Sequence, residues 1–140
     1  MKAANLFSQD GVVYFQQGHV KGDGEILLYN TSNELTECGA CNAYVIKDGV
    51  VATPALDNQI LPGITRQITL KVLRDDGTIP VEERVVTMDE VWNADEVWIS
   101  SSSKELVPVV KLDGKPVGDG KAGPVWEAAA KLYKAGKFNF

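Results

Sequence analysis

The clearest structural signal in the sequence is the stretch Ala43-Tyr44-Val45-Ile46-Lys47-Asp48-Gly49-Val50-Val51-Ala52-Thr53. Two runs rich in β-branched and aromatic residues flank the pair Asp48-Gly49, which favours a two-residue type I′ turn. The stretch therefore predicts a β-hairpin. The same pattern returns at residues 109–117, where Asp113-Gly114 separates two short runs and predicts a second hairpin.

Helical patterns follow the first hairpin. Ile64, Ile68 and Val72 recur every fourth residue after Pro62-Gly63, so they predict a helix with an apolar stripe that ends at residues 75–77. The sequence Thr-Met-Asp-Glu at 87–90 is typical of a capping box at a helix start. The other predicted elements are helices over 3–17 and 124–134 and strands over 25–29, 34–36, 81–86 and 96–99. Strands and helices alternate without a regular βαβ period, which predicts a single domain of mixed α/β (α+β) class.

The composition is that of a folded, acidic protein. The chain has 140 residues, a formal net charge of −5 and 44% hydrophobic residues, so it is long enough to bury a core and too apolar for a disordered segment. The acidic balance argues against a nucleic-acid groove and an anionic membrane surface, because both attract clustered Lys and Arg. Without an apolar run of about 18 residues or a signal-peptide pattern, we expect a soluble, cytoplasmic protein.

Cys38 and Cys41 form a Cys-x-x-Cys motif. Two thiols at this spacing can cycle as a redox disulfide, or they can supply half of a zinc site. His19 is the single histidine and there is no further cysteine, so a four-ligand Cys/His site cannot close and we expect no metal. The strand pattern after the motif argues against a redox helix. Small buried residues in a turn are the preferred interpretation, with a thiol-redox function as the alternative.

Two polar segments could each hold an anion. A helix that starts at Gly63-Ile64-Thr65 offers free backbone N–H groups, a hydroxyl group and a glycine that permits close approach. The serine run 100–103, at the end of a predicted strand, offers further hydroxyl groups. Either segment can also be an ordinary helix start or turn. Together they favour a phosphorylated ligand.

Four segments in order resemble the class IV (fold-type IV) pyridoxal-phosphate aminotransferases. They are LTECGACNAYVIKDG at 35–49, ILPGITR at 60–66, ISSSSKELVPV at 99–109 and DGKPVGDGK at 113–121. The resemblance covers essentially the whole chain. It implies that residues 1–140 are the cofactor-binding, C-terminal domain of such an enzyme, with a mixed sheet or pseudo-barrel and flanking helices, and without the N-terminal small domain. The match starts at Lys2-Ala3-Ala4-Asn5-Leu6, which is similar to the segment around the lysine that holds the cofactor.

The resemblance implies pyridoxal 5′-phosphate as cofactor and a role for each matched residue. Lys2 would form the internal aldimine and shuttle the proton at the substrate α-carbon, and Glu37 would keep the pyridine nitrogen protonated. The backbone N–H groups of Ile64 and Thr65, with the Thr65 hydroxyl, would hold the phosphate. The remaining expected cofactor-binding residues are Ala40, Cys41, Asn42 and Gly63, together with Ser101 and Ser102 as a second phosphate seat.

The serine run also bears on the substrate. Residues 100–103 are more similar to D-amino acid transaminases than to branched-chain aminotransferases, which more often have Gly-Thr-Ala-Ala there. We therefore expect a D-amino acid and a 2-oxo acid as substrates, with a branched-chain type as the alternative. Without the small domain, we expect weak cofactor binding and little or no activity, and a non-catalytic binding or dimerisation module is the other alternative. Such enzymes are usually homodimeric. We expect a monomer or an altered dimer here, with no nucleic-acid or membrane partner.

Overall fold

The computed structural model describes residues 11–17, 24–29, 34–35, 42–55, 63–101, 105–112, 115–118 and 120–136. The strands are β1 (Gly11–Gln17), β2 (Gly24–Tyr29), β3 (Asn42–Lys47), β4 (Val50–Thr53), β5 (Val81–Glu83), β6 (Glu96–Ser101), β7 (Glu105–Leu112) and β8 (Lys115–Pro116). The helices are α1 (Ile64–Asp76), α2 (Met88–Trp92) and α3 (Pro124–Gly136). Within these residues, no helix has both the length and the apolar character needed to cross a membrane.

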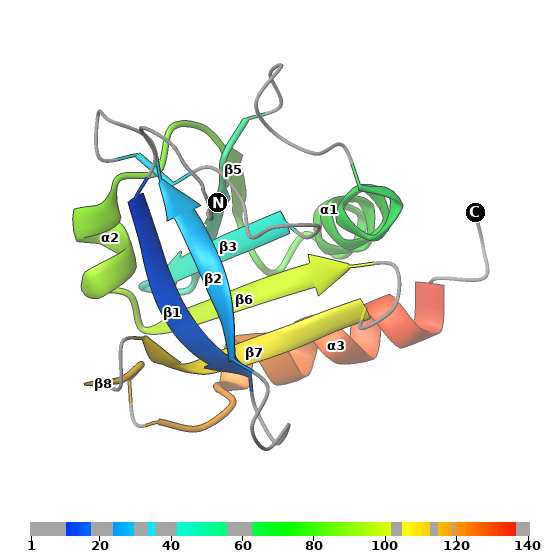
Figure 1. Cartoon of the computed structure of the whole chain (residues 1–140). Helices are drawn as coiled ribbons and strands as arrows, with labels where there is room; N and C mark the ends of the chain where they lie inside the picture. The colour runs from blue at the N-terminus through cyan, green and yellow to red at the C-terminus, as the bar shows by residue number, and fades with distance from the viewer. Residues whose placement is uncertain are drawn as a thin grey trace.

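The described strands form one sheet in the order β2-β1-β7-β6-β3-β4-β5, and β8 pairs with β7 outside this path. Neighbouring strands are antiparallel except for β4 and β5, which run parallel, so the sheet is mixed. Figure 1 shows α1 by the C-terminal end of β6 and α3 running alongside β7, whereas α2 lies on the other side of the view. The predicted mixed α/β fold with flanking helices is therefore confirmed.

The β3–β4 hairpin forms as the sequence predicts. Its ladder pairs Lys47 with Val50. Asp48 has a φ of 52° and Gly49 has a φ of 80°, and positive φ at both central positions is what a type I′ turn requires. The second predicted hairpin is also confirmed, because β7 and β8 pair antiparallel.

Strands β3 and β6 are covered on both faces. Successive side chains of a strand point to opposite faces, so Tyr44 and Trp98 lie on the face that packs against α1 and α3, with ring centroids 5.8 Å apart. On the other face, Val45 and Val97 pack into a second core. The described members of this second core from α2 and its flanks are Val86, Met88, Val91 and Ala94. These two strands therefore lie at the centre of the packed core, and Asn42, Ser100 and Ser101 of the predicted site lie at their ends.

Helix α1 confirms the predicted helix but not its predicted apolar stripe. The helix ends at Gly77, whose φ of 78° is the left-handed conformation in which helices commonly stop. Of the three residues in the predicted stripe, Ile64 is 71% exposed and Ile68 is half-buried, whereas Val72 is buried, so the stripe does not describe the buried face. The buried residues of α1 are Thr65, Arg66, Thr69, Leu70, Val72 and Leu73. Thr65 and Thr69 can face inward because their hydroxyl groups donate to the carbonyl oxygens of Ser101 and Thr65, respectively.

The helix predicted over residues 3–17 is wrong for residues 11–17, which form β1. The segment is rich in β-branched and aromatic residues, which have high strand propensity, and β1 pairs with both β2 and β7. Residues 3–10 lie outside the described residues. The strand predicted over 81–86 is shorter than expected, since β5 ends at Glu83. The segment 34–36 contributes only an isolated bridge between Glu34 and Thr87 in its described part.

The capping box predicted at the start of α2 is confirmed. The backbone N–H of Glu90 donates to the hydroxyl of Thr87 at 3.3 Å, and the backbone N–H of Thr87 donates to the Glu90 carboxylate at 2.9 Å. Each residue therefore satisfies a donor that the helix itself leaves without an acceptor.

The start of α3 is capped by a residue far away in the sequence. The Glu96 carboxylate, which is buried, accepts hydrogen bonds from the backbone N–H groups of Val125 at 3.0 Å and Trp126 at 2.8 Å. It also accepts one from the indole N–H of Trp98 at 3.0 Å. A strand residue thus fixes the position of the terminal helix against the sheet.

Candidate functional site

The described residues of the predicted site meet at one end of the sheet, where β3 starts, β6 ends and α1 begins. Asn42 pairs with Ser100 across β3 and β6. The hydroxyl of Thr65 donates to the carbonyl oxygen of Ser101 at 3.1 Å. Figure 1 shows the C-terminal end of β6 pointing toward α1. The fold therefore brings together residues that the sequence places on three separate segments.

Gly63, the residue before α1, leaves no room for a side chain. An ideal Cβ on Gly63 would lie 2.6 Å from Oδ1 of Asn42. Gly63 has a φ of −68° and a ψ of 144°, a conformation that any residue can adopt. Glycine is needed here for space and not for its dihedral freedom. The backbone at the start of α1 therefore packs directly on the buried amide of Asn42.

The N-terminus of α1 is suited to an anion. Gly63 provides no capping side chain, and the first turn of α1 contains no acidic residue. The first N–H groups of a helix have no intrahelical acceptor and carry a partial positive charge. The guanidinium of Arg66, in the same turn, is already paired with the carboxylate of Glu83, so the backbone N–H groups are the donors that this turn offers. A phosphate or carboxylate is the kind of ligand that such a helix start binds.

The hydroxyl of Thr65 has a more specific place than the sequence predicts. Thr65 is 5% exposed, and its hydroxyl hydrogen points to the carbonyl oxygen of Ser101. This hydrogen bond ties the first turn of α1 to the end of β6. The backbone N–H groups of α1 then remain as the donors for an anion.

Tyr44 is a residue of this region that the sequence analysis did not single out. Its hydroxyl oxygen lies 2.7 Å from Oγ of Ser100 in a buried hydrogen bond. Burial raises the pKa of Tyr44 to about 12, and the neighbouring hydroxyls of Ser100 and Thr69 act in the opposite direction. Ser100, the first residue of the serine run, is thus turned into the core, whereas Ser101 is half-buried at the end of β6. No local pattern predicts this pair, because its partners are 56 residues apart.

Arg66 is a second residue that the sequence analysis did not assign. Its guanidinium, 2% exposed, donates from Nη2 to the carbonyl oxygen of Pro54 and to Oε1 of Glu83, both at 3.0 Å. The other carboxylate oxygen of Glu83 binds Arg74 at 2.8 Å. Among the described side chains, Nε of Arg66 is the buried polar atom that has no partner. The two residues that accept from Nη2 of Arg66 lie 12 and 17 positions away in the sequence. Periodicity within the helix therefore does not reveal that Arg66 is buried.

Five residues of the predicted site lie outside the described residues. They are Lys2, Glu37, Ala40, Cys41 and Ser102. Their assigned roles, and the state of the Cys38–Cys41 pair, therefore stay predictions. Within the residues that the structure does describe, no group of three or more His, Cys, Asp or Glu side chains is arranged to hold a metal ion.

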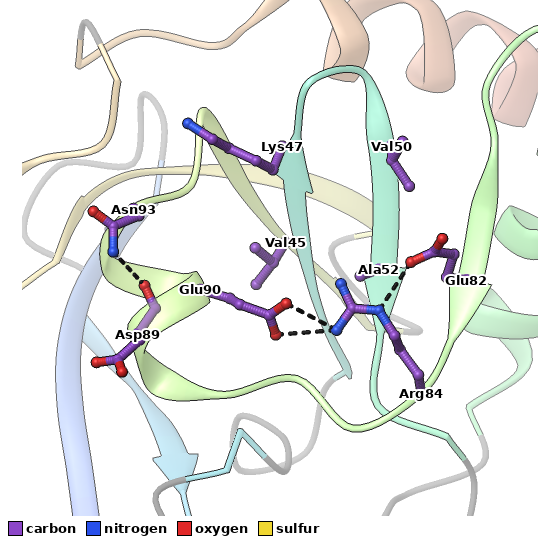
Figure 2. A pocket seen from close by; sticks show the side chains of 9 residues that line it. All are labelled: Val45, Lys47, Val50, Ala52, Glu82, Arg84, Asp89, Glu90 and Asn93. Carbon is purple, nitrogen blue, oxygen red and sulfur yellow. Dashed lines mark hydrogen bonds and ion pairs between the residues drawn. The ribbon is translucent and has the colours of Figure 1, made fainter.

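A separate cavity of about 360 Å³ lies on the β3–β4 hairpin, on the face that is turned away from α1 and α3 (Figure 2). Its apolar floor includes Val45 and Ala52, and Arg84 stands on its wall between two glutamates. Arg84 binds Glu82 and Glu90, each at 2.9 Å, so these three charged groups satisfy one another. This cavity shares no residue with the α1 end of the sheet, and we assign the candidate site to the latter.

Comparison with known proteins points to one enzyme family. The family model for class IV amino-transferases matches residues 10–112. The D-alanine aminotransferase of Staphylococcus aureus (strain COL) is 44% identical over 125 residues, which cover 89% of this chain and 43% of that protein. The solved branched-chain amino acid aminotransferase of Escherichia coli is 34% identical with a TM-score of 0.70, and the match covers 75% of this chain and 35% of that chain.

A third relative was solved with a bound cofactor. The aminotransferase of Brucella abortus, in complex with pyridoxal phosphate, is 28% identical with a TM-score of 0.71, over 78% of this chain and 38% of that chain. The chain of 140 residues thus spans less than half the length of each of these three proteins.

Proposed function

Because the chain belongs to the class IV aminotransferases, we propose that it supplies the cofactor-binding part of an enzyme that moves an amino group from an amino acid to a 2-oxo acid, with pyridoxal 5′-phosphate as cofactor. One observation carries this proposal. The uncapped N-terminus of α1 lies against the end of β6, to which the Thr65–Ser101 hydrogen bond joins it. Two segments that could each bind an anion therefore form one site.

The residues at this end of the sheet fit a phosphate group. A phosphate dianion needs several N–H or O–H donors and gains from nearby positive charge. The first turn of α1 offers backbone donors without a competing acidic side chain. Gly63 brings this backbone against Asn42 without an intervening side chain.

The remaining roles are assigned by resemblance. When bound, pyridoxal phosphate supplies a pyridine ring that accepts electrons from the bond broken at the substrate α-carbon. Lys2 is proposed to carry the cofactor and to take up and return the proton at that carbon. Glu37 is proposed to hold a proton at the pyridine nitrogen, so that the ring stays electron-accepting. The backbone of Ile64 and Thr65 is proposed to orient the ring by holding its phosphate.

We propose a D-amino acid such as D-alanine as the amino donor. The D-alanine aminotransferase relative supports this choice at 44% identity. A branched-chain L-amino acid is the second candidate, because the solved branched-chain enzyme shares the fold at 34% identity. Transamination rates with D-alanine and with L-leucine, each with 2-oxoglutarate, distinguish the two. For residues 1–140 alone we propose weak cofactor binding and little turnover, and rapid turnover would contradict this last point.

The cofactor assignment is tested by chemical trapping. The protein is mixed with pyridoxal phosphate, reduced with borohydride and digested, and the modified residue is mapped by mass spectrometry. We expect one label per chain, on Lys2, and its loss in Lys2→Ala. Lys47→Ala is the matched control, because Lys47 is an exposed lysine in the β3–β4 hairpin and pairs with Asp95. Label scattered over many lysines would contradict the assignment, and a folded protein without stoichiometric label would favour a non-catalytic binding module.

A further inference from the structure

A set of buried hydroxyl groups lies directly behind the proposed phosphate site. The hydroxyl groups of Tyr44 and Ser100 are 2.7 Å apart. The hydroxyl of Thr69 donates to the carbonyl oxygen of Thr65 at 2.7 Å, and it is also a hydrogen-bonding neighbour of Tyr44. Thr65 in turn donates to the carbonyl oxygen of Ser101. We call Tyr44, Thr65, Thr69 and Ser100 the hydroxyl network.

The hydroxyl network joins three elements at positions where apolar side chains could also pack. Tyr44 comes from β3, Ser100 comes from β6, and the two threonines come from α1, and all four are buried. Burying a hydroxyl group is unfavourable unless it is hydrogen-bonded. A hydrogen bond is directional and fixes the separation of its partners, whereas apolar contacts tolerate sliding. The network therefore sets how far the first turn of α1 stands from the end of β6.

This separation matters because the proposed phosphate is shared between α1 and β6. A donor binds an anion well only within about 2.7–3.2 Å. A slide of α1 by one residue along its axis would move its N–H groups by about 1.5 Å, which is enough to break such contacts. Thr65 is held from two directions, by Thr69 at its carbonyl group and by Ser101 at its hydroxyl group.

We propose that the hydroxyl network positions the phosphate site, with Tyr44, Ser100 and Thr69 acting through Thr65 to keep the first turn of α1 in register with the end of β6. The inference rests on the proposed function and adds the buried residues that set the affinity for the phosphate group. Tyr44, Thr69 and Ser100 are positioning residues, because they lie behind the site and act through Thr65.

The experiment separates affinity for the phosphate group from affinity for the rest of the cofactor. Dissociation constants are measured for pyridoxal phosphate and for pyridoxal, which lacks the phosphate, and their ratio is compared between variants. Thr65→Val removes the hydroxyl group and keeps the shape, and Thr65→Ser keeps the hydroxyl group. Thr53→Val is the matched control, because the buried Thr53 hydroxyl donates to the carbonyl oxygen of Ala43 at 2.8 Å outside the network. The free energy of unfolding is measured for each variant.

We expect Thr65→Val to reduce the preference for pyridoxal phosphate over pyridoxal by about 2- to 13-fold, the range that corresponds to one neutral hydrogen bond. Thr65→Ser should keep the preference of the unaltered protein. Thr53→Val should lower the free energy of unfolding to a similar extent as Thr65→Val and leave the preference unchanged. A merely structural role of Thr65 would not produce this difference between the two valine variants.

The positioning role would be overturned if Thr65→Val left the preference for pyridoxal phosphate over pyridoxal unchanged, or if Thr53→Val lowered this preference equally. Either result would leave cofactor binding itself in place. If the unaltered protein shows no preference for the phosphorylated form, the proposed function fails, and this inference fails with it. The double variant Tyr44→Phe/Ser100→Ala is measured as well, because Thr65 is itself proposed to hold the phosphate, whereas Tyr44 and Ser100 form a buried pair behind it. That variant removes both partners of one hydrogen bond and leaves neither unpaired. We expect the same reduced preference there, and an unchanged preference would overturn the inference.

Discussion

The carboxylate of Glu96 fills the space that a methyl group on Gly123 would take. An ideal Cβ on Gly123 would stand 2.2 Å from Cδ of Glu96 and 2.5 Å from its Oε2. Because residue 123 has no side chain, the start of α3 comes close enough for two of its backbone N–H groups to reach the carboxylate. The glycine and the glutamate therefore act as one structural unit.

Glu96→Gln should destabilise the protein by about 1.5–3 kcal/mol, the typical value of a hydrogen bond to a charged group. The amide keeps the shape of the side chain, but its NH₂ group faces a backbone donor and cannot accept from it. Urea unfolding measures the change. Glu127→Gln, at an exposed position in the first turn of α3, is the control and should change stability by less than about 0.5 kcal/mol. Equal effects of the two substitutions would contradict the capping role of Glu96.

Gly123→Ala should destabilise the protein by about 1–3 kcal/mol, because the added methyl group overpacks the Glu96 side chain and displaces its carboxylate. In a Glu96→Ala background the same substitution should cost much less, since the space is then open. A double-mutant cycle with unfolding free energies measures this coupling. Additive effects would show that Gly123 and Glu96 do not compete for one space.

Tyr44 should keep its proton to unusually high pH, because burial raises its pKa to about 12, whereas an exposed tyrosine titrates near pH 10. Above about pH 10 the unfolded chain releases this proton and the folded chain retains it. Stability should therefore fall by about 1.4 kcal/mol per pH unit from this group until about pH 12. Ultraviolet titration of tyrosinate absorbance should show one late step that Tyr44→Phe removes. A late step that persists in Tyr44→Phe would refute the assignment.

Glu83 should contribute to stability in a pH-dependent way. Burial by itself would raise the pKa of Glu83, but hydrogen bonds from Arg74 and Arg66 outweigh it and hold the pKa below its usual value. The contribution is therefore complete above the unfolded carboxyl pKa of about 4.3 and is lost as the pH falls through the lower folded value.

Substitution at Glu83 checks this expectation. At neutral pH, Glu83→Gln should cost about 1.5–3 kcal/mol of unfolding free energy, because it weakens the compensation of the buried Arg66 charge. At acid pH the difference from the unaltered protein should shrink. Glu82→Gln, which breaks an ion pair between exposed side chains, is the control and should cost less than about 1 kcal/mol. A cost of Glu83→Gln that does not change with pH would contradict the mechanism.

The parts of the fold that depend on neighbouring residues were predictable from the sequence. Asp48-Gly49 encodes its turn in two residues, and Thr87 and Glu90 form their capping box within one helical turn. The elements that were wrong depend on distant partners. Residues 11–17 form a strand that pairs with β7. The inward face of α1 carries Thr65 and Thr69 beside Leu70 and Leu73, because the fold gives both hydroxyl groups an acceptor.

In the candidate site, too, the residues found from the sequence belong to local motifs, and the residues that were missed depend on distant partners. Gly63, Thr65 and Ser101 belong to motifs that resemble a known family, and the fold brings them together. Tyr44 was not found, because a tyrosine within an apolar strand pattern reads as a core residue, and only the fold places Ser100 opposite its hydroxyl. Arg66 was not found because its acceptors come from other segments.

The strand order has a consequence for how the chain folds as it is synthesised. In the sheet, β1 lies between β2 and β7, and Gln17 pairs with Val109. On the ribosome, β1 and β2 therefore emerge long before β7, and until then one edge of β1 lacks its final neighbour. Exposed strand edges pair readily with other chains, so the nascent β1–β2 hairpin is the segment that a chaperone or slow translation before β7 would affect most. Strand β3 also waits for a later neighbour, β6, but β6 follows β3 more closely in the sequence than β7 follows β1, so its edge is exposed for a shorter time.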